Sequence, residues 1–317
     1  MATAAAPPPI PGEGIDPPPK EVPEVIQRLE QGDGATATAV GVGYRALNRF
    51  SHANASLLAA GTTYYQFLAL FSLIALAYGV TAILDADQIA SWLTRAISEA
   101  FPGLLGAEGI DPGELRSIGQ TTGIIGLAVM LYAGGGAMAA ASSSIHQIYG
   151  APPDPRGFVP ARARLLAWLV LVGPLIAFSL VAGSVLLRLG NRVFAELGIE
   201  GTTDRILLSI AGMALTVVVD FAVVYVFLRH LGGIRPARRA LLVGSGVGAL
   251  GLAIVRVPMG LILELSLDKP QYGAFTIPIG VLLVLYFNAM VLFGSAALTA
   301  GIAEQDIPLE DITAGEG

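Results

Sequence analysis

The sequence contains no cysteine and few charged residues. Asp, Glu, Lys and Arg make up 13% of the 317 residues, whereas a soluble globular domain carries about 25%. Without cysteine, the chain can form no disulfide, thiolate metal site or cysteine nucleophile. The formal net charge is −6, which argues against the broad basic surface that binds nucleic acid. We therefore expect no nucleic-acid partner.

The motifs of hydrolytic and nucleotide-driven chemistry are also missing. His52, His146 and His230 share no metal-ligand spacing such as HExxH, and the sequence contains no Walker A motif. Gly244-Ser245-Gly246 lacks the strand-turn-helix setting of a nucleophile elbow. We expect no catalytic residue, no cofactor and no metal, and predict that the protein is not an enzyme. A membrane-anchored nuclease is the least favoured hypothesis.

Hydrophobic residues, in contrast, make up 54% of the chain, and the mean hydropathy is +0.68. Two apolar runs, Leu165–Leu187 and Ile206–Leu228, contain a single charged side chain, Asp220. At ~1.5 Å per helical residue, a run of this length reaches ~35 Å and crosses the ~30 Å hydrocarbon core of a bilayer. The sequence therefore predicts an all-α integral membrane protein.

Six segments of the chain are long and apolar enough to span a membrane as helices. They comprise residues 56–84, 119–149, 165–187, 206–228, 240–263 and 272–303. We predict one polytopic membrane domain, 41–303, formed by a bundle of six transmembrane helices. A disordered, Pro/Ala-rich tail, 1–40, precedes this domain, and an acidic tail, 304–317, follows it.

Two shorter amphipathic helices are expected outside the spans. The external segment 85–118 has apolar residues at helical spacing between Ile89 and Ala100, which predicts a helix that lies on the outer leaflet or caps the bundle. Residues 43–52 place Arg45 and Arg49 on one helical face, a pattern typical of a short helix at the membrane surface.

The distribution of positive charge predicts the orientation. With the N-terminal tail inside, nine arginines near the membrane fall on the inner side, against five arginines and one lysine on the outer side. The loops 155–164 and 229–239 carry the densest positive charge and are assigned to the cytoplasm. Both termini are then cytoplasmic. Residues 1–19 lack the basic and apolar regions of a cleavable signal peptide.

Asp220 and Arg256 are the ionisable residues predicted to lie deep within spans. A bare carboxylate at the centre of a span costs roughly 2.5–3.5 kcal/mol, so Asp220 should face the bundle interior, water or a partner. The predicted depths of the two residues differ by ~10 Å, which helix tilt and the long Arg256 side chain would largely close. The two residues are candidates for a transport pathway. The alternatives are a structural ion pair, or an Arg256 side chain that extends outward to the membrane surface.

A second candidate group lies at the start of the first span. Thr62 and Gln66 are four residues apart and share a helical face, and Tyr65 lies on the adjacent stripe. These side chains would either line a polar cavity or form hydrogen bonds between helices. Two glycine patterns, Gly134-Gly135-Gly136 and Gly244-x-x-x-Gly248, indicate close helix packing.

Three segments in succession resemble the YihY/BrkB family of bacterial inner-membrane proteins, which includes the YhjD-type members. They are AAGTTYYQFLALFSL (59–73), LYAGGGAMAAASSSIHQIYG (131–150) and YGAFTIPIGVLLVLYFNAMVLFGSAALTA (272–300). The resemblance covers roughly residues 45–303 and implies a six-helix fold in the bacterial plasma membrane. It further implies a role in envelope integrity, or in transport of an envelope lipid or small amphiphile.

The chain departs from the family pattern at three places. Ser72 stands where a proline is frequent, and His146 stands where an asparagine is common. No carboxylate falls between Gly294 and Ala303, where the family often has a glutamate. A role for that glutamate therefore does not carry over to this chain.

Two functional hypotheses remain open from the sequence. The first is a transporter whose partners are membrane lipids and whose substrate is a lipid or small amphiphile. The second is a structural scaffold of the envelope that moves nothing. Assembly into a homo-oligomer is compatible with either.

Overall fold

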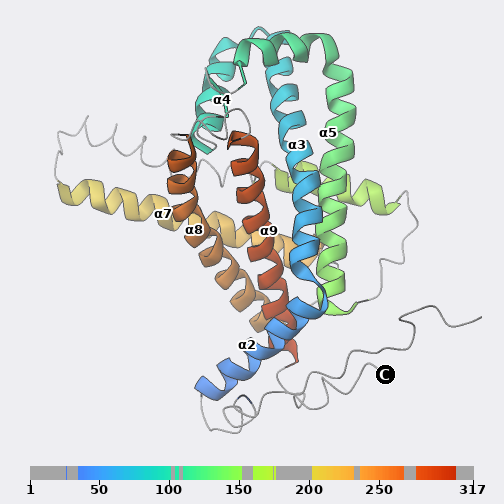
Figure 1. The fold of residues 1–317 in the computed structure, drawn as a ribbon, viewed down its shortest axis with the longest axis vertical. Coiled ribbons are helices and arrows are strands. Elements are labelled where there is room, and N and C mark those ends of the chain that lie inside the picture. The colour runs from blue at the N-terminus through green and yellow to red at the C-terminus, as the bar shows by residue number, and fades with distance from the viewer. Residues whose placement is uncertain are drawn as a thin grey trace, which may run out of the picture.

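The part of the protein that the computed structural model describes consists mainly of helices, joined by short turns (Figure 1). This part comprises residues 35–100, 104–106, 110–151, 160–173, 202–231, 236–267 and 276–304, with the single positions 26 and 175. The helices are α2 (Ala35–His52), α3 (Ala55–Ile83), α4 (Asp87–Ala100), α5 (Pro112–Tyr149), α7 (Thr202–Val226), α8 (Arg238–Leu267) and α9 (Thr276–Ala303), with a π-helical turn, η1 (Phe227–Leu231). Residues 160–173 are also helical.

Five helices of the described part are long and apolar enough to cross a membrane. The candidate spans are Ala55–Ile83, Gly126–Tyr149, Ile210–Leu231, Arg238–Arg256 and Pro278–Ala303. They correspond to the first, second, fourth, fifth and sixth predicted spans. Most of the third predicted span, 165–187, lies outside the described residues, so the count of six stays a prediction.

Two clusters of buried side chains connect the helices. The larger joins α5, α7, α8 and α9 near α2 and includes Ile145, Leu228 and Phe293. The smaller lies at the opposite end of α3, beside α4, and includes Tyr78 and Ile97. Figure 1 shows α3 and α5 running side by side along most of their length, with α9 next to α3.

The segment predicted to be external contains a helix, α4, and its position outside the membrane stays a prediction. Ile97 is buried against the smaller cluster, and the Tyr78 and Thr94 hydroxyls are hydrogen-bonded at 2.6 Å, which joins α4 to α3. Ile89 and Trp92 remain half exposed. One part of the apolar face therefore packs on protein, while a Trp at the other part is typical of the membrane interface.

The short helix predicted at residues 43–52 is longer and packs on protein rather than lying free at the surface. α2 begins at Ala35, inside the segment predicted to be a disordered tail, and lies across the end of α9 (Figure 1). Arg45 is buried, and Arg49 forms an ion pair with Glu304, just beyond α9. A Cβ added to Gly301 would lie 2.8 Å from a backbone nitrogen of α2. Both arginines therefore contact the protein, and the position of α2 at a membrane surface stays a prediction.

The predicted glycine face on α8 packs against α9. Three α8–α9 contacts follow one another in antiparallel order, namely Gly244 with Thr299, Gly248 with Ser295, and Gly251 with Val291. The Ser295 and Thr299 hydroxyls donate to carbonyls one turn earlier in α9, at 2.8 and 2.7 Å. Their polar atoms therefore need no partner on α8, and the two backbones can approach closely.

A matched pair of substitutions tests this packing. A Cβ on Gly248 would lie 2.4 Å from the Ser295 hydroxyl, whereas a Cβ on Gly246 would meet nothing within 4 Å. We expect Gly248→Ala to destabilise the fold by about 1–3 kcal/mol through overpacking, and Gly246→Ala to leave it unchanged or slightly more stable. Thermal unfolding in detergent measures the difference. Equal midpoints for the two variants would contradict the α8–α9 contact.

Candidate functional site

The structure brings Asp220 of α7 and Arg256 of α8 together in a two-pronged ion pair. Nη1 of Arg256 donates to Oδ2 of Asp220 at 2.5 Å, and Nη2 donates to Oδ1 at 2.8 Å. Both residues belong to candidate spans. Arg256 therefore reaches an intramembrane carboxylate instead of extending outward to the membrane surface.

The reach of the arginine side chain completes the pair. α7 crosses α8 at a steep angle (Figure 1), and Val224 contacts Gly248 near the crossing. Asp220 lies four residues before Val224 in α7, and Leu252 lies four residues after Gly248 in α8. Arg256 lies one turn beyond Leu252, and its long side chain covers the remaining ~6 Å.

The two partners differ in exposure. The Asp220 side chain is 2% exposed and that of Arg256 is 34% exposed. In hydrocarbon, each charge alone would cost several kcal/mol, whereas a bidentate pair neutralises both and satisfies two donors and two acceptors. Removal of one partner leaves the other uncompensated, so the pair constrains the α7–α8 crossing whatever further role it has.

The polar residues predicted at the start of the first span mostly form hydrogen bonds or packing contacts within the protein. Thr62 is fully buried, and its hydroxyl donates to the carbonyl of Leu58 at 2.9 Å. The Tyr65 ring packs over Gly136 of α5, where an added Cβ would lie 2.5 Å from the ring. Within the described part, the buried Gln66 Oε1 has no hydrogen-bond partner. Thr62 and Tyr65 thus help α3 to pack, and a polar cavity lined by these residues stays a prediction.

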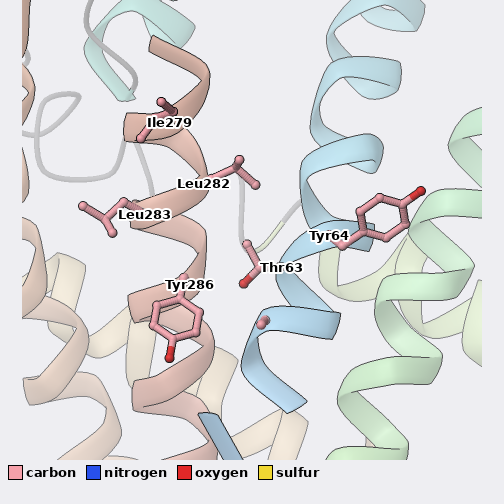
Figure 2. Close-up of a pocket in the computed structure, with 7 residues that line it drawn as sticks. Thr63, Tyr64, Ile279, Leu282, Leu283 and Tyr286 are labelled. Atoms are coloured by element: carbon pink, nitrogen blue, oxygen red, sulfur yellow. The ribbon is translucent and has the colours of Figure 1, made fainter. Parts of the chain in front are cut away.

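A groove of about 340 Å³ lies between α3 and α9, and Thr62, Tyr65 and Gln66 do not line it (Figure 2). Its walls are Ala60, Thr63 and Tyr64 of α3, and Ile279, Leu282, Leu283 and Tyr286 of α9. The accessible surface inside is almost entirely carbon, and the groove is open along one side. Such walls suit a hydrocarbon chain and offer no charge to an ion.

The sequence contains a signal for this groove that the search for polar groups missed. The α9 lining residues recur at helical i, i+3, i+4 and i+7 spacing, on a face turned away from the α8 contact at Val291. The α3 lining follows the same spacing from Ala60 to Tyr64. In an all-apolar helix, however, the same stripe also fits simple packing or lipid contact, so the spacing alone predicts no groove.

The end of α7 is held by two other helical segments. The Ser142 hydroxyl of α5 donates to the carbonyl of Leu231 at 2.8 Å, and Arg164 donates to the carbonyl of His230 in η1. The Trp168 and His230 rings lie 5.2 Å apart. Among the described residues, no group of three or more His, Asp or Glu side chains could hold a metal ion.

Comparison with protein-family models gives one match. The family described as virulence factor BrkB matches residues 46–314, which include all five candidate spans and both residues of the ion pair. Neither the curated proteins nor the solved structures provide a match.

A double-mutant cycle tests the ion pair. We expect Asp220→Leu and Arg256→Met each to destabilise the fold by about 3–5 kcal/mol, because each leaves one uncompensated charge among the helices. The double variant should recover most of this loss, since no charge then remains. Thermal unfolding of the three variants in detergent gives the coupling. Additive losses in the double variant would show that the residues do not pair.

Proposed function

Because the chain belongs to the BrkB family, we propose that this multi-pass membrane protein lies in the bacterial plasma membrane and moves an envelope lipid or small amphiphile. The observation that carries this proposal is the open, carbon-lined groove between α3 and α9. The proposal includes no catalytic step, and its partners are the surrounding lipids and the transported molecule.

The location of the groove favours a ligand that arrives from the bilayer. Both of its walls, α3 and α9, are candidate spans. Tyr64 and Ile279 in the lining are more than half exposed, so the groove continues onto the outer surface of the helices. A ligand with an acyl chain could enter sideways from hydrocarbon without crossing a polar barrier.

The size and chemistry of the lining fit one chain rather than a large polar molecule. The groove, about 340 Å³ in volume, is shallow and largely open, so it would cover one face of an acyl chain and leave the other face in lipid. Lipid tails are as apolar as leucine, so burial alone gives a ligand little affinity inside a bilayer. Selectivity would come from shape, because the lining is almost entirely carbon and the Thr63 hydroxyl already donates to the Ala59 carbonyl at 2.8 Å.

A structural scaffold is the second candidate function. The close α8–α9 contact along Gly244, Gly248 and Gly251, together with the Gly301 contact to α2, supports a rigid bundle. A scaffold would hold lipids or a second copy of the chain at its surface without moving them. The two functions differ in whether the groove exchanges its contents between leaflets.

For the orientation, we place both termini in the cytoplasm and α4 on the outer side. In this arrangement α2 and the Arg49–Glu304 ion pair lie at the cytoplasmic end of the bundle. The arginines of the loops 155–164 and 229–239 then lie on the side favoured by the positive-inside rule.

A groove-filling substitution tests transport. In proteoliposomes, we expect the protein to speed movement of a fluorescent single-chain phospholipid between leaflets. Leu282→Trp, which fills the groove because the Leu282 side chain points from α9 toward α3 (Figure 2), should slow this movement about tenfold, the effect of losing ~1.4 kcal/mol of binding. The matched control is Leu57→Trp, because Leu57 is 72% exposed on α3 and does not line the groove. External quenching of the fluorophore gives the rate.

The outcomes of this assay separate the two functions. A wild-type rate equal to that of empty vesicles would contradict transport and favour the scaffold. Equal rates for wild type and both Trp variants, all above empty vesicles, would show that movement does not use the groove.

The absence of native cysteine allows a direct test of orientation. Single cysteines can replace Ser91 of α4 and Thr36 of α2, both of which are exposed. We expect a membrane-impermeant maleimide to label Ser91→Cys in intact cells, and Thr36→Cys only after the plasma membrane is permeabilised. Labelling of Thr36→Cys in intact cells would place the N-terminal helix outside.

A further inference from the structure

We propose that Arg256 is an anion-binding site of the membrane domain, in which the Asp220 carboxylate occupies the place of a phosphate or carboxylate ligand. The ligand chemistry is an anionic group with two oxygens on one centre, whether it belongs to a lipid headgroup or to a free anion. This site is additional to the α3–α9 groove and does not depend on it.

The geometry of the pair is that of anion recognition. A guanidinium binds carboxylates and phosphates through two parallel N–H···O bonds. Arg256 makes this contact to Oδ1 and Oδ2 of Asp220, at 2.8 and 2.5 Å. The two carboxylate oxygens therefore mark where two oxygens of a ligand would lie against the same edge of the guanidinium.

The exposure of the two side chains indicates that the ligand carries a negative charge. Asp220 is enclosed between helices, with its side chain 2% exposed, whereas about a third of the Arg256 side chain is exposed. A ligand that approaches from outside the bundle meets the positive partner first. A cationic ligand would have to reach the buried carboxylate and would be repelled by the guanidinium in front of it.

The anion site and the groove lie at one depth but on different sides of α9. Gly251 of α8 lies against Val291 of α9. Five residues further along α8 is Arg256, and five residues back along antiparallel α9 is Tyr286, which lines the groove. Tyr286 and Val291 point about 140° apart around the helix axis. Because α9 separates the two sites, each can be altered without filling the other.

Asp220 competes with the ligand in this arrangement. As long as the carboxylate holds the guanidinium, an external anion must displace it, which lowers the apparent affinity of the site. Asp220→Asn removes the competing charge and leaves a side chain of similar shape. A purely structural pair differs in the wild type, where it predicts no phosphate preference because the carboxylate keeps the guanidinium occupied. In Asp220→Asn the guanidinium is uncompensated under either account, so the wild-type preference is the decisive measurement.

Two lipid probes with the same acyl chain test the proposal. Full-length protein in a non-ionic detergent is mixed with palmitoyl lysophosphatidate, which carries a phosphate, and with monopalmitoylglycerol, which carries none. Native mass spectrometry gives the ratio of bound probes. We expect wild type to prefer the phosphate probe by about tenfold, and Asp220→Asn to raise the preference by roughly another tenfold.

Removal of the guanidinium should abolish the preference. Arg256→Gln and the double variant Asp220→Asn/Arg256→Gln should bind both probes equally. The uncharged double variant keeps the test valid if Arg256→Gln alone fails to fold. Arg256→Lys retains the charge but not the two-pronged geometry, and should show an intermediate preference. The matched control is Arg95→Gln, an arginine exposed on α4 whose removal should leave the preference at the wild-type value.

The outcomes show whether the bound anion is a lipid headgroup or a free anion. They also distinguish failure of the anion site from failure of transport through the groove. Displacement of the phosphate probe by inorganic phosphate would show that the site accepts free anions, and no displacement would restrict it to lipid headgroups. A preference that survives in the Asp220→Asn/Arg256→Gln variant, or no preference in wild type, would overturn the proposal. Leu282→Trp alters only the groove. Loss of transport in this variant, with an intact phosphate preference, would therefore separate the two sites.

Discussion

The structure depends on one constraint, which is that hydrocarbon provides no water to charges and hydrogen-bonding groups. A polar atom on a spanning helix is therefore stabilised by a partner within the protein, although Gln66 Oε1 has none among the described residues. Asp220 and Arg256 satisfy each other across two helices. The hydroxyls of Thr62 and Thr299 satisfy themselves on their own helices. The ion pair constrains how α7 crosses α8. Because the threonine hydroxyls bond to their own helices, α3 and α9 can pack against neighbours through small residues.

The same constraint separates two kinds of helix surface. Where helices meet closely, small residues such as Gly248 and Gly301 bring the backbones together, because packing rather than the hydrophobic effect drives association in lipid. Where α3 and α9 diverge, large apolar side chains leave the open groove. A closely packed part, α8 with α9 and α2, thus adjoins the open groove to which the proposed function assigns a ligand.

Much of the fold could be predicted from the sequence, since the length and composition of apolar runs determine which helices can span a bilayer. The predicted first span, 56–84, differs from Ala55–Ile83 by one residue at each end. The ion pair between Asp220 and Arg256 was one of the alternatives that the sequence left open, because the cost of unpaired charge requires a partner or water but does not say which. The contact of α2 with α9 could not be predicted from the sequence. The four-residue spacing of Arg45 and Arg49 is the same whether their helix lies on a membrane surface or packs on another helix. The groove was also missed, because carbon-lined walls carry no distinctive residue type.

The most direct test of this account is a density map of the protein in lipid nanodiscs at a resolution that shows side chains. We predict continuous density between the Arg256 guanidinium and either Asp220 or a bound anionic group, with an elongated lipid-like feature between α3 and α9. An Arg256 side chain directed to the outer headgroups, with Asp220 facing a water-filled cavity, would contradict the central claim that these charges are matched within the membrane.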